Sequence, residues 1–242
     1  MDLVQISATK LRLIGDVRAR SFRATLASAM VYPVSQESLM PFQSPPYWHP
    51  GIYRLSEFPR RGRRAVRERI RAVIGPNQRV FDAAALFGEL RGSLEPSCAY
   101  QGVDAVANLV RHAQRRGLDV RLEDPASDSR FPQSDAVVLI DRLHHVTRPQ
   151  AQRILDKALQ AAPLVLVVEP TFLQWTQLKG IGWFFDWFFR ALDSNGYNKG
   201  FIWYTKAQYL QEFPQLFGLD RRDFTVDVSE VGSNLLAVYR QR

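Results

Sequence analysis

Five strand-length apolar runs alternate with other segments, and two further strands joined by a tight turn close the sequence. Two of the five runs, 136-AVVLI-140 and 164-LVLVV-168, are apolar throughout, which is typical of parallel strands covered on both faces. The last two strands, 222–230 and 233–241, are joined by a turn at Gly232, so they can pair only antiparallel. The sequence therefore predicts an α/β fold with a doubly wound, mostly parallel seven-stranded sheet and an antiparallel C-terminal hairpin.

Helices are expected between these strands. A basic amphipathic helix over 63–74 ends at Gly75-Pro76, a typical stop signal. The clearest later helices are predicted over 104–116 and 148–161. The predicted strands before the hairpin are 79–83, 99–104, 119–123, 135–140 and 164–169. The turn after the first strand is expected to lead into a helix opened by Gly88.

Length and composition fit one α/β domain with a leading segment. A chain of 242 residues that is 46% hydrophobic can bury one large core. Prolines concentrated between residues 41 and 59 preclude a regular helix there, so residues 1–60 are interpreted as an N-terminal lid. Residues 61–242 are interpreted as the α/β domain, with an insertion at 171–213.

Cysteine content and hydropathy indicate the cellular compartment of the protein. The only cysteine, Cys98, excludes a disulfide framework and a Cys-rich metal site, and it fits a reducing interior. No stretch reaches the roughly 18 to 20 apolar residues of a membrane span, and the N-terminus lacks the apolar core of a signal peptide. We therefore expect a cytoplasmic protein.

The net charge of +8 is concentrated in 60-RRGRRAVRERIR-71. Such a run suits an anionic membrane or nucleic acid. A solvated helix face, with Val66, Ile70 and Val73 on its buried side, explains the same run more simply. No zinc-finger spacing, RNA-recognition signature or helix-turn-helix pattern accompanies it, so nucleic acid is not the expected partner.

Acidic residues end each of the five predicted parallel strands. They are Asp82, Asp104, Asp124, Asp141 and Glu169. Each one alone is explained by the preference of carboxylates for helix N-termini. Ligands of open α/β sheets bind beyond the carboxyl ends of the strands, however, and an acid placed like Asp104 can accept both hydroxyl groups of a ribose. The series therefore indicates a nucleoside site at this edge.

At these residues the chain resembles the class I S-adenosylmethionine-dependent methyltransferases, over roughly residues 63–240. The stretch 80-VFDAAALFGEL-90 is similar to the glycine-rich first motif, and 102-GVD-104 is similar to the ribose-binding stretch. The turn LIDRLHHV, followed by LVLVVEP, is similar to the D-x-LHH turn of small-molecule and lipid-type methyltransferases. The resemblance implies a Rossmann-like methyltransferase fold and S-adenosylmethionine as the cofactor.

The resemblance also implies which residues bind that cofactor. They are Asp82, Ala84, Leu86, Gly88, Asp104, Asp124 and Asp141. Asp104 would hold the ribose and Asp124 the adenine, whereas Asp141 would border the methionine moiety and the acceptor. In the first motif Asp82 and Gly88 match the family, but Ala84 and Leu86 replace its first two glycines.

Leucine in a glycine position is expected to change the loop. A left-handed backbone costs a leucine about 1–2 kcal/mol, and the side chain projects toward the ligand space. We therefore expect a different loop path at Leu86. Two outcomes stay open: a methyltransferase with an altered loop, or a non-catalytic methyltransferase-fold protein that serves as a partner subunit or binding module.

An active enzyme would transfer a methyl group by in-line displacement, which depends mainly on proximity and orientation. A general base would assist a hydroxyl acceptor, and His144 and His145 are the candidate catalytic residues. The alternative is a structural histidine pair. No third ligand follows at a recognisable spacing, so no metal site is expected.

The segment 172–210 holds four of the five tryptophans, and in the resembled family it forms part of the acceptor pocket. It can enclose an apolar or aromatic acceptor, such as a lipid-linked or polyketide-like compound, together with the 42–53 loop. It can also rest on a membrane surface through 181–192, or form core packing or a homodimer face. The expected acceptor is therefore small or lipid-like, with peripheral membrane contact and a homodimer as alternatives.

Overall fold

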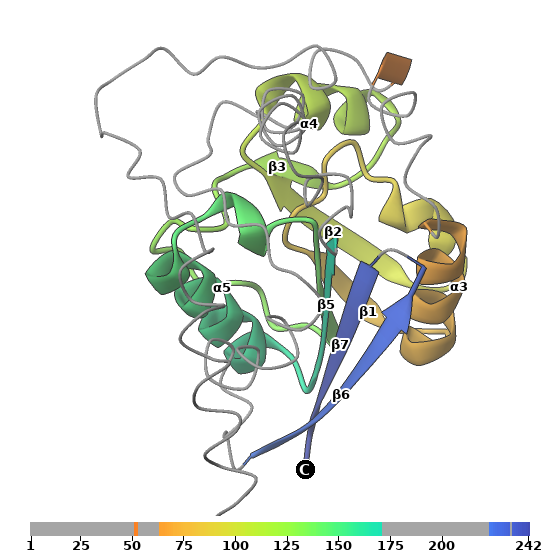
Figure 1. Ribbon diagram of the computed structural model, residues 1–242. Helices are drawn as coiled ribbons and strands as arrows, with labels where there is room; N and C mark the ends of the chain where they lie inside the picture. Colours follow the sequence, from red (N-terminus) through yellow and green to blue (C-terminus); the bar gives the residue numbers. More distant parts are fainter. Residues whose placement is uncertain (1–50, 53–62, 171–222, 233) are drawn as a thin grey trace, which may run out of the picture. The chain divides into compact units, whose positions relative to one another are not determined.

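A computed structural model gives the fold of the protein and describes residues 51–52, 63–170, 223–232 and 234–242 (Figure 1). The chain divides into two units, Met1–Ser38 and Leu39–Arg242, and the described residues all belong to the second. Apart from residues 51 and 52, the predicted lid at 1–60 lies outside the described residues, and so does the whole predicted insertion at 171–213.

The second unit is built on a seven-stranded sheet in the order β3-β2-β1-β4-β5-β7-β6. The strands are β1 (Arg79–Asp82), β2 (Ala99–Asp104), β3 (Val120–Leu122), β4 (Ala136–Ile140), β5 (Leu164–Pro170), β6 (Phe224–Val231) and β7 (Asn234–Gln241). The strands from β3 to β5 pair in parallel, and β7 pairs antiparallel with both β5 and β6. The predicted doubly wound sheet with an antiparallel C-terminal hairpin is confirmed.

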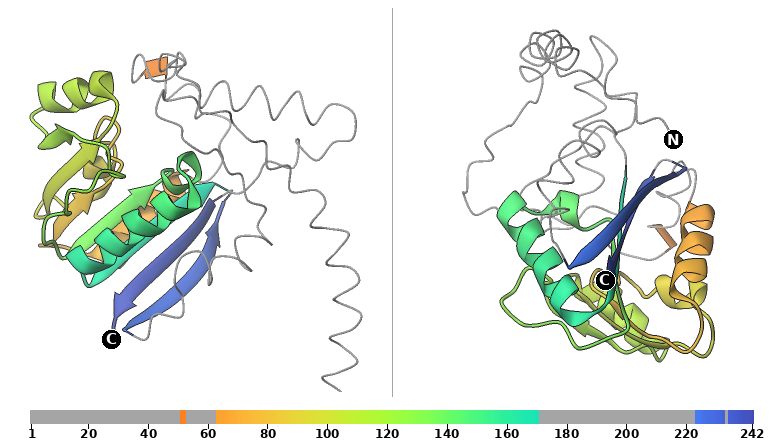
Figure 2. Two further views of the ribbon diagram at one scale, coloured as in Figure 1. Left: turned by 90° about the vertical axis from the view of Figure 1, so that its left-hand side faces the viewer. Right: turned by 90° about the horizontal axis from the view of Figure 1, so that it is seen from below.

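Strand order reverses between β1 and β4, so the carboxyl ends of these two neighbours form the topological switch point. Helix α5 (Arg148–Ala161) packs on one face of the sheet, and α3 (Arg63–Ile74) and α4 (Ala107–Arg115) pack on the other (Figures 1 and 2). Val137 of β4 joins the core beneath α5, whereas its neighbour Val138 joins the core beneath α3. This burial on both faces accounts for the uninterrupted apolar runs.

Local sequence explains the bounds of the long helices. In α3 the buried residues Val66, Ile70 and Ile74 recur at a spacing of four and form one apolar face. The helix stops at Gly75, which has a φ of 73°. Helix α5 begins with a capping box between Thr147 and Gln150. The predicted bounds 63–74 and 148–161 are both correct.

The helix expected after β1 does not form. Residues 83–98 are all described, and they make turns and the short 3-10 helix η3 (Leu90–Ser93). Gly88 therefore opens no helix; its N–H donates to the carbonyl oxygen of Ala85 at 2.7 Å and closes a turn. The loop accordingly lacks the helix N-terminus that would attract a carboxylate.

Candidate functional site

The loop after β1 is fixed by hydrogen bonds to both neighbouring strands. The N–H of Ala83 donates to the carbonyl oxygen of Val138 in β4 at 2.9 Å. The N–H of Ala85 donates to the carbonyl oxygen of Val103 in β2 at 3.0 Å. The loop therefore lies over the switch point and is anchored on either side of it.

Leu86 adopts a left-handed backbone conformation, which glycine adopts more readily than leucine. Its φ is 49°, in the left-handed region, and its N–H donates to Oδ2 of Asp104 at 2.9 Å. Its half-buried side chain packs against the cluster of Phe87, Val106 and Leu109. One hydrogen bond and apolar packing offset a conformational cost of about 1–2 kcal/mol at Leu86. The expected change of loop path stays a prediction.

Asp104 joins the loops that follow β1 and β2. Its Oδ2 accepts the N–H of Leu86, and its Oδ1 accepts the N–H of Val106 at 2.8 Å. Burial raises the pKa of Asp104, while the N–H of Val106 and the positive charge of Arg142 act in the opposite direction. Each carboxylate oxygen has a second lone pair, so hydroxyl groups can still bind there.

Asp82 supports the same loop from beneath and is 2% exposed. The hydroxyl of Tyr100 donates to its Oδ2 at 2.9 Å, and the N–H of Ala84 donates to its Oδ1 at 3.3 Å. Burial raises the pKa of Asp82 to about 7, although the bond from Tyr100 acts to lower it. A Cβ added at the adjacent Gly102 would lie 2.7 Å from Cβ of Ala85, so this packing is tight.

The turn after β4 connects the switch point to the loop after β3. Asp141 has a φ of 50°, and its N–H donates to the carbonyl oxygen of Val168 at 2.9 Å. The next side chain, Arg142, is buried, and its Nη2 donates to Oδ1 of Asp124 at 2.7 Å. Asp124, the residue expected to contact adenine, is thereby tied to the β4 turn.

Glu169, at the end of β5, organises the 3-10 helix η4 (Leu143–His145). Its Oε1 accepts the N–H of Arg142 at 3.1 Å and the N–H of Leu143 at 2.7 Å. Its Oε2 lies 2.5 Å from Nδ1 of His144, and the ring of His145 lies 4.0 Å from that of His144 between centroids. All of these side chains are buried. The catalytic roles of His144 and His145 stay predictions, because this contact suits a structural pair and also a base oriented by a carboxylate.

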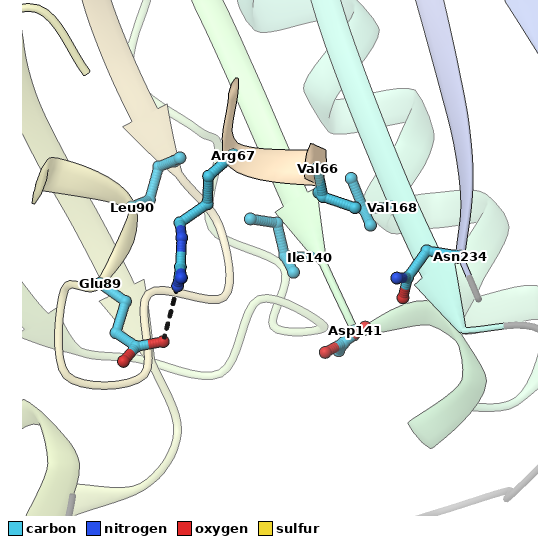
Figure 3. Close-up of a pocket in the computed structure, with 8 residues that line it drawn as sticks. All are labelled: Val66, Arg67, Glu89, Leu90, Ile140, Asp141, Val168 and Asn234. Carbon is cyan, nitrogen blue, oxygen red and sulfur yellow. Dashed lines mark ion pairs between the residues drawn. The ribbon is translucent and has the colours of Figure 1, made fainter. Parts of the chain in front are cut away.

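A hollow of about 390 Å³, which includes open solvent, lies at the carboxyl ends of β4 and β5 (Figure 3). It is lined by Val66, Arg67, Glu89, Leu90, Ile140, Asp141, Val168 and Asn234. In Figure 3 Arg67 points toward Glu89, at 3.8 Å between Nη1 and Oε2, while Asp141 and Asn234 lie on the other side. Charges of both signs around apolar side chains suit a small zwitterionic group.

Sequence reasoning missed most of this hollow. Among the predicted site residues only Asp141 lines it, whereas Arg67, Glu89 and Asn234 come from three distant segments. The position of Glu89, directly after the first-motif Gly88, was the one available signal. The predicted residues of the first motif do come together with Asp104 around a single loop.

Within the ranges that the structure describes, no group of three or more His, Cys, Asp and Glu side chains could hold a metal ion. In the same ranges, no helix has the length and apolar character needed to cross a bilayer.

No protein-family model matches the chain, and no curated protein matches its sequence. Solved structures do share its fold. The 16S rRNA methyltransferase RmtF in complex with S-adenosyl-L-homocysteine has a TM-score of 0.52 at 19% identity, over 79% of this chain and 65% of that one. The DhpI complex with the same ligand has a TM-score of 0.53 at 21% identity, over 78% of this chain and 86% of that one.

A third similar structure is the O-methyltransferase NcsB1 from neocarzinostatin biosynthesis, in complex with S-adenosylmethionine and 2-hydroxy-5-methyl naphthoic acid. Its TM-score is 0.54 at 19% identity, over 78% of this chain and 56% of that one. The chain thus spans about two thirds of the length of RmtF and a little over half that of NcsB1. Together with the strand order, these structures show a Rossmann-like methyltransferase fold.

Proposed function

We propose that this chain is an S-adenosylmethionine-dependent methyltransferase that acts on a small or lipid-like acceptor. The observation that carries the proposal is the hollow beyond β4 and β5, beside the loop that Asp104 anchors. The three similar structures contain S-adenosylmethionine or S-adenosyl-L-homocysteine, and one of them also contains an aromatic acid.

The charged side chains around the hollow suit the amino-acid end of this cofactor. That end carries a carboxylate and an ammonium group, and the hollow offers Arg67 for the first and the carboxylates of Glu89 and Asp141 for the second. Since no α-helix follows the β1 loop, a helix N-terminus cannot supply the positive charge. Arg67 of α3 would supply it instead.

The nucleoside end would lie along the ends of β2 and β3. The second lone pairs of the Asp104 oxygens would accept the two ribose hydroxyls. Asp124 would accept the adenine amino group, the role that the family resemblance gives it. The side chain of Leu86, absent in a glycine motif, would pack beside the ribose and narrow the site.

The bound cofactor would supply an electrophilic methyl group on a sulfonium. The residues of the chain would orient the acceptor toward it and exclude water from the site. His144, whose Nδ1 lies 2.5 Å from Oε2 of Glu169, would act as the base only for an acceptor that reaches its buried Nε2. Burial of both side chains fixes the orientation of the imidazole ring.

One observation favours a second candidate, a non-catalytic partner subunit or binding module. Both oxygens of Asp104 already accept backbone N–H groups, and the residue is only 7% exposed. A site closed in this way would keep the fold without holding a nucleoside.

Calorimetric titration with S-adenosylmethionine and S-adenosyl-L-homocysteine distinguishes the two. The proposal expects binding, and it expects Asp104→Asn to weaken that binding about tenfold or more, since charge-assisted hydrogen bonds contribute about 1.5–3 kcal/mol. The matched control is Asp135→Asn, at the amino end of β4, which pairs with Arg79 and should leave affinity unchanged. A folded wild-type protein that gives no heat would favour the second candidate.

Asp104→Ala is the less informative variant. It removes both acceptors for the N–H groups of Leu86 and Val106, so it disturbs two loops as well as the site. Asparagine keeps the shape of the side chain and an acceptor for one of these N–H groups, while its NH2 group faces the other, so it disturbs the loops less than alanine does and is the better test.

A further inference from the structure

We infer that Arg142 is a positioning residue, which reaches from the β4 turn to the loop after β3 and holds Asp124 ready for the nucleoside. This role rests on the proposed function. It is separate from the hollow, because Arg142 does not line it.

The strand order makes the reach of Arg142 unusual. Strands β2 and β1 lie between β3 and β4, so the Arg142–Asp124 bond joins loops that belong to non-adjacent strands. Oδ1 of Asp124 accepts Nη2 of Arg142 at 2.7 Å and also the N–H of Ala126 at 2.9 Å. Two donors on one oxygen fix the carboxylate plane, and Oδ2 lies outside both bonds.

Stability alone does not account for this arginine. Its side chain is 6% exposed, and its Nε has no hydrogen-bond partner among the residues that the structure describes. A buried donor without a partner is destabilising, and a buried ion pair seldom outweighs an apolar replacement of similar size. Such an arrangement is better explained by the acids beside it.

The positive charge of Arg142 also acts on Asp104. The charged and titratable neighbours of Asp104 are Asp82 from β1, Tyr100 from β2, Asp124 after β3 and Arg142 after β4. Burial raises the pKa of Asp104, Asp124 raises it further, and the positive charge of Arg142 lowers it. Arg142 therefore favours the ionised carboxylate that accepts two hydroxyl groups.

The test compares Arg142→Met with Arg142→Lys by calorimetric titration of S-adenosyl-L-homocysteine at about pH 8.5 and about pH 6. Without the positive charge the pKa of Asp104 rises, so more of this carboxyl is protonated at the lower pH. Arg142→Met should therefore bind more weakly than the wild type at pH 8.5, and its loss of affinity should be larger at pH 6. Arg142→Lys keeps the charge and should show the wild-type pH dependence.

Two matched variants complete the design. Arg79→Met removes an arginine that also pairs with an aspartate but lies at the amino end of β1. It should leave the ligand affinity unchanged at both pH values. Asp124→Asn, at a half-buried position, removes a negative neighbour of Asp104 and should make the pH dependence shallower while weakening binding. If a thermal melt shows that Arg142→Met is not folded, Asp124→Asn still tests the role of the Arg142–Asp124 pair.

The outcomes separate the two proposals. A wild-type protein that binds no ligand overturns the proposed function and this role with it. If the wild type binds the ligand, and Arg142→Met and Asp124→Asn each lose the same factor in affinity at both pH values, the proposed function stands. Arg142 is then a structural residue only.

Discussion

Nδ1 of His144 lies 2.5 Å from Oε2 of Glu169, and the two side chains are 0% and 1% exposed. The other oxygen of Glu169 accepts the N–H groups of Arg142 and Leu143. One carboxylate at the end of β5 thus fixes the turn after β4, and this relationship does not depend on any ligand.

We expect a double-mutant cycle on this pair to show strong coupling. His144→Ala and Glu169→Ala should each cost about 3–5 kcal/mol, because each leaves a buried polar partner uncompensated. The double variant should cost about 1–3 kcal/mol less than their sum, as measured by urea unfolding. The exposed pair of Arg64 and Glu68 is the control, with coupling of about 0.5 kcal/mol or less. Additive losses at His144 and Glu169 would contradict the buried contact.

At Leu86 we expect glycine and alanine variants to show the reverse of their usual order of stability. At most positions alanine is more stabilising than glycine by about 0.5–1 kcal/mol. With φ at 49°, Leu86→Gly should instead be more stable than Leu86→Ala by about 1 kcal/mol, although both lose the packing against Phe87 and Val106. Chemical denaturation of the two variants measures the difference. The ordinary ranking would show that the left-handed conformation is wrong.

The stability of the protein should depend on pH through Asp82. The pKa of Asp82 is about 7 in the fold against 3.8 as the reference value, so the folded state holds a proton that the unfolded chain has lost between these values. The stability that protonated Asp82 contributes is fully present below the unfolded pKa of 3.8 and is lost as pH rises through the folded pKa of about 7. Asp82→Asn should therefore gain about 2–4 kcal/mol relative to the wild type between pH 4 and pH 8.

Urea unfolding at several pH values measures this gain. Asp135→Asn is the contrasting variant, because the bond from Arg79 lowers the pKa of Asp135, and it should show no such gain at high pH. A constant difference between wild type and Asp82→Asn would show that Asp82 is ionised throughout.

Gly102 is expected to be intolerant of any side chain. A Cβ there would lie 2.7 Å from Cβ of Ala85 and 3.1 Å from the carbonyl oxygen of Asp82, so Gly102→Ala must displace the β1 loop. The cost should be about 1–3 kcal/mol in a thermal or urea melt. Gly92→Ala, where nothing lies within 4 Å, is the control and should be neutral or slightly stabilising. Equal effects at the two glycines would indicate a looser loop.

The sheet could be predicted because its signals are local. The apolar runs of β4 and β5, and the four-residue spacing of Val66, Ile70 and Ile74 in α3, record burial directly. The structure of the segment after β1 could not be predicted, because its alanines and leucines favour a helix. Hydrogen bonds from Ala83 and Ala85 to the flanking strands override that preference.

The candidate site was only partly predictable for a related reason. Asp82 and Asp104 could be identified because each ends a strand, and strand ends share one edge. The bond between Arg142 and Asp124 joins loops of non-adjacent strands, and Arg67 enters the hollow from a helix that precedes the sheet. Nothing in residue spacing encodes such contacts.

The place of β7 within the sheet affects how the protein folds during synthesis. Residues Leu164–Pro170 of β5 take their outer partners from Asn234–Arg240, so that edge stays unpaired while the intervening residues emerge from the ribosome. An apolar strand exposed in this way can recruit other chains. Nascent chains that stall before Asn234 should therefore be aggregation-prone and depend on chaperones, even though the first motif and every acidic strand end have already been translated.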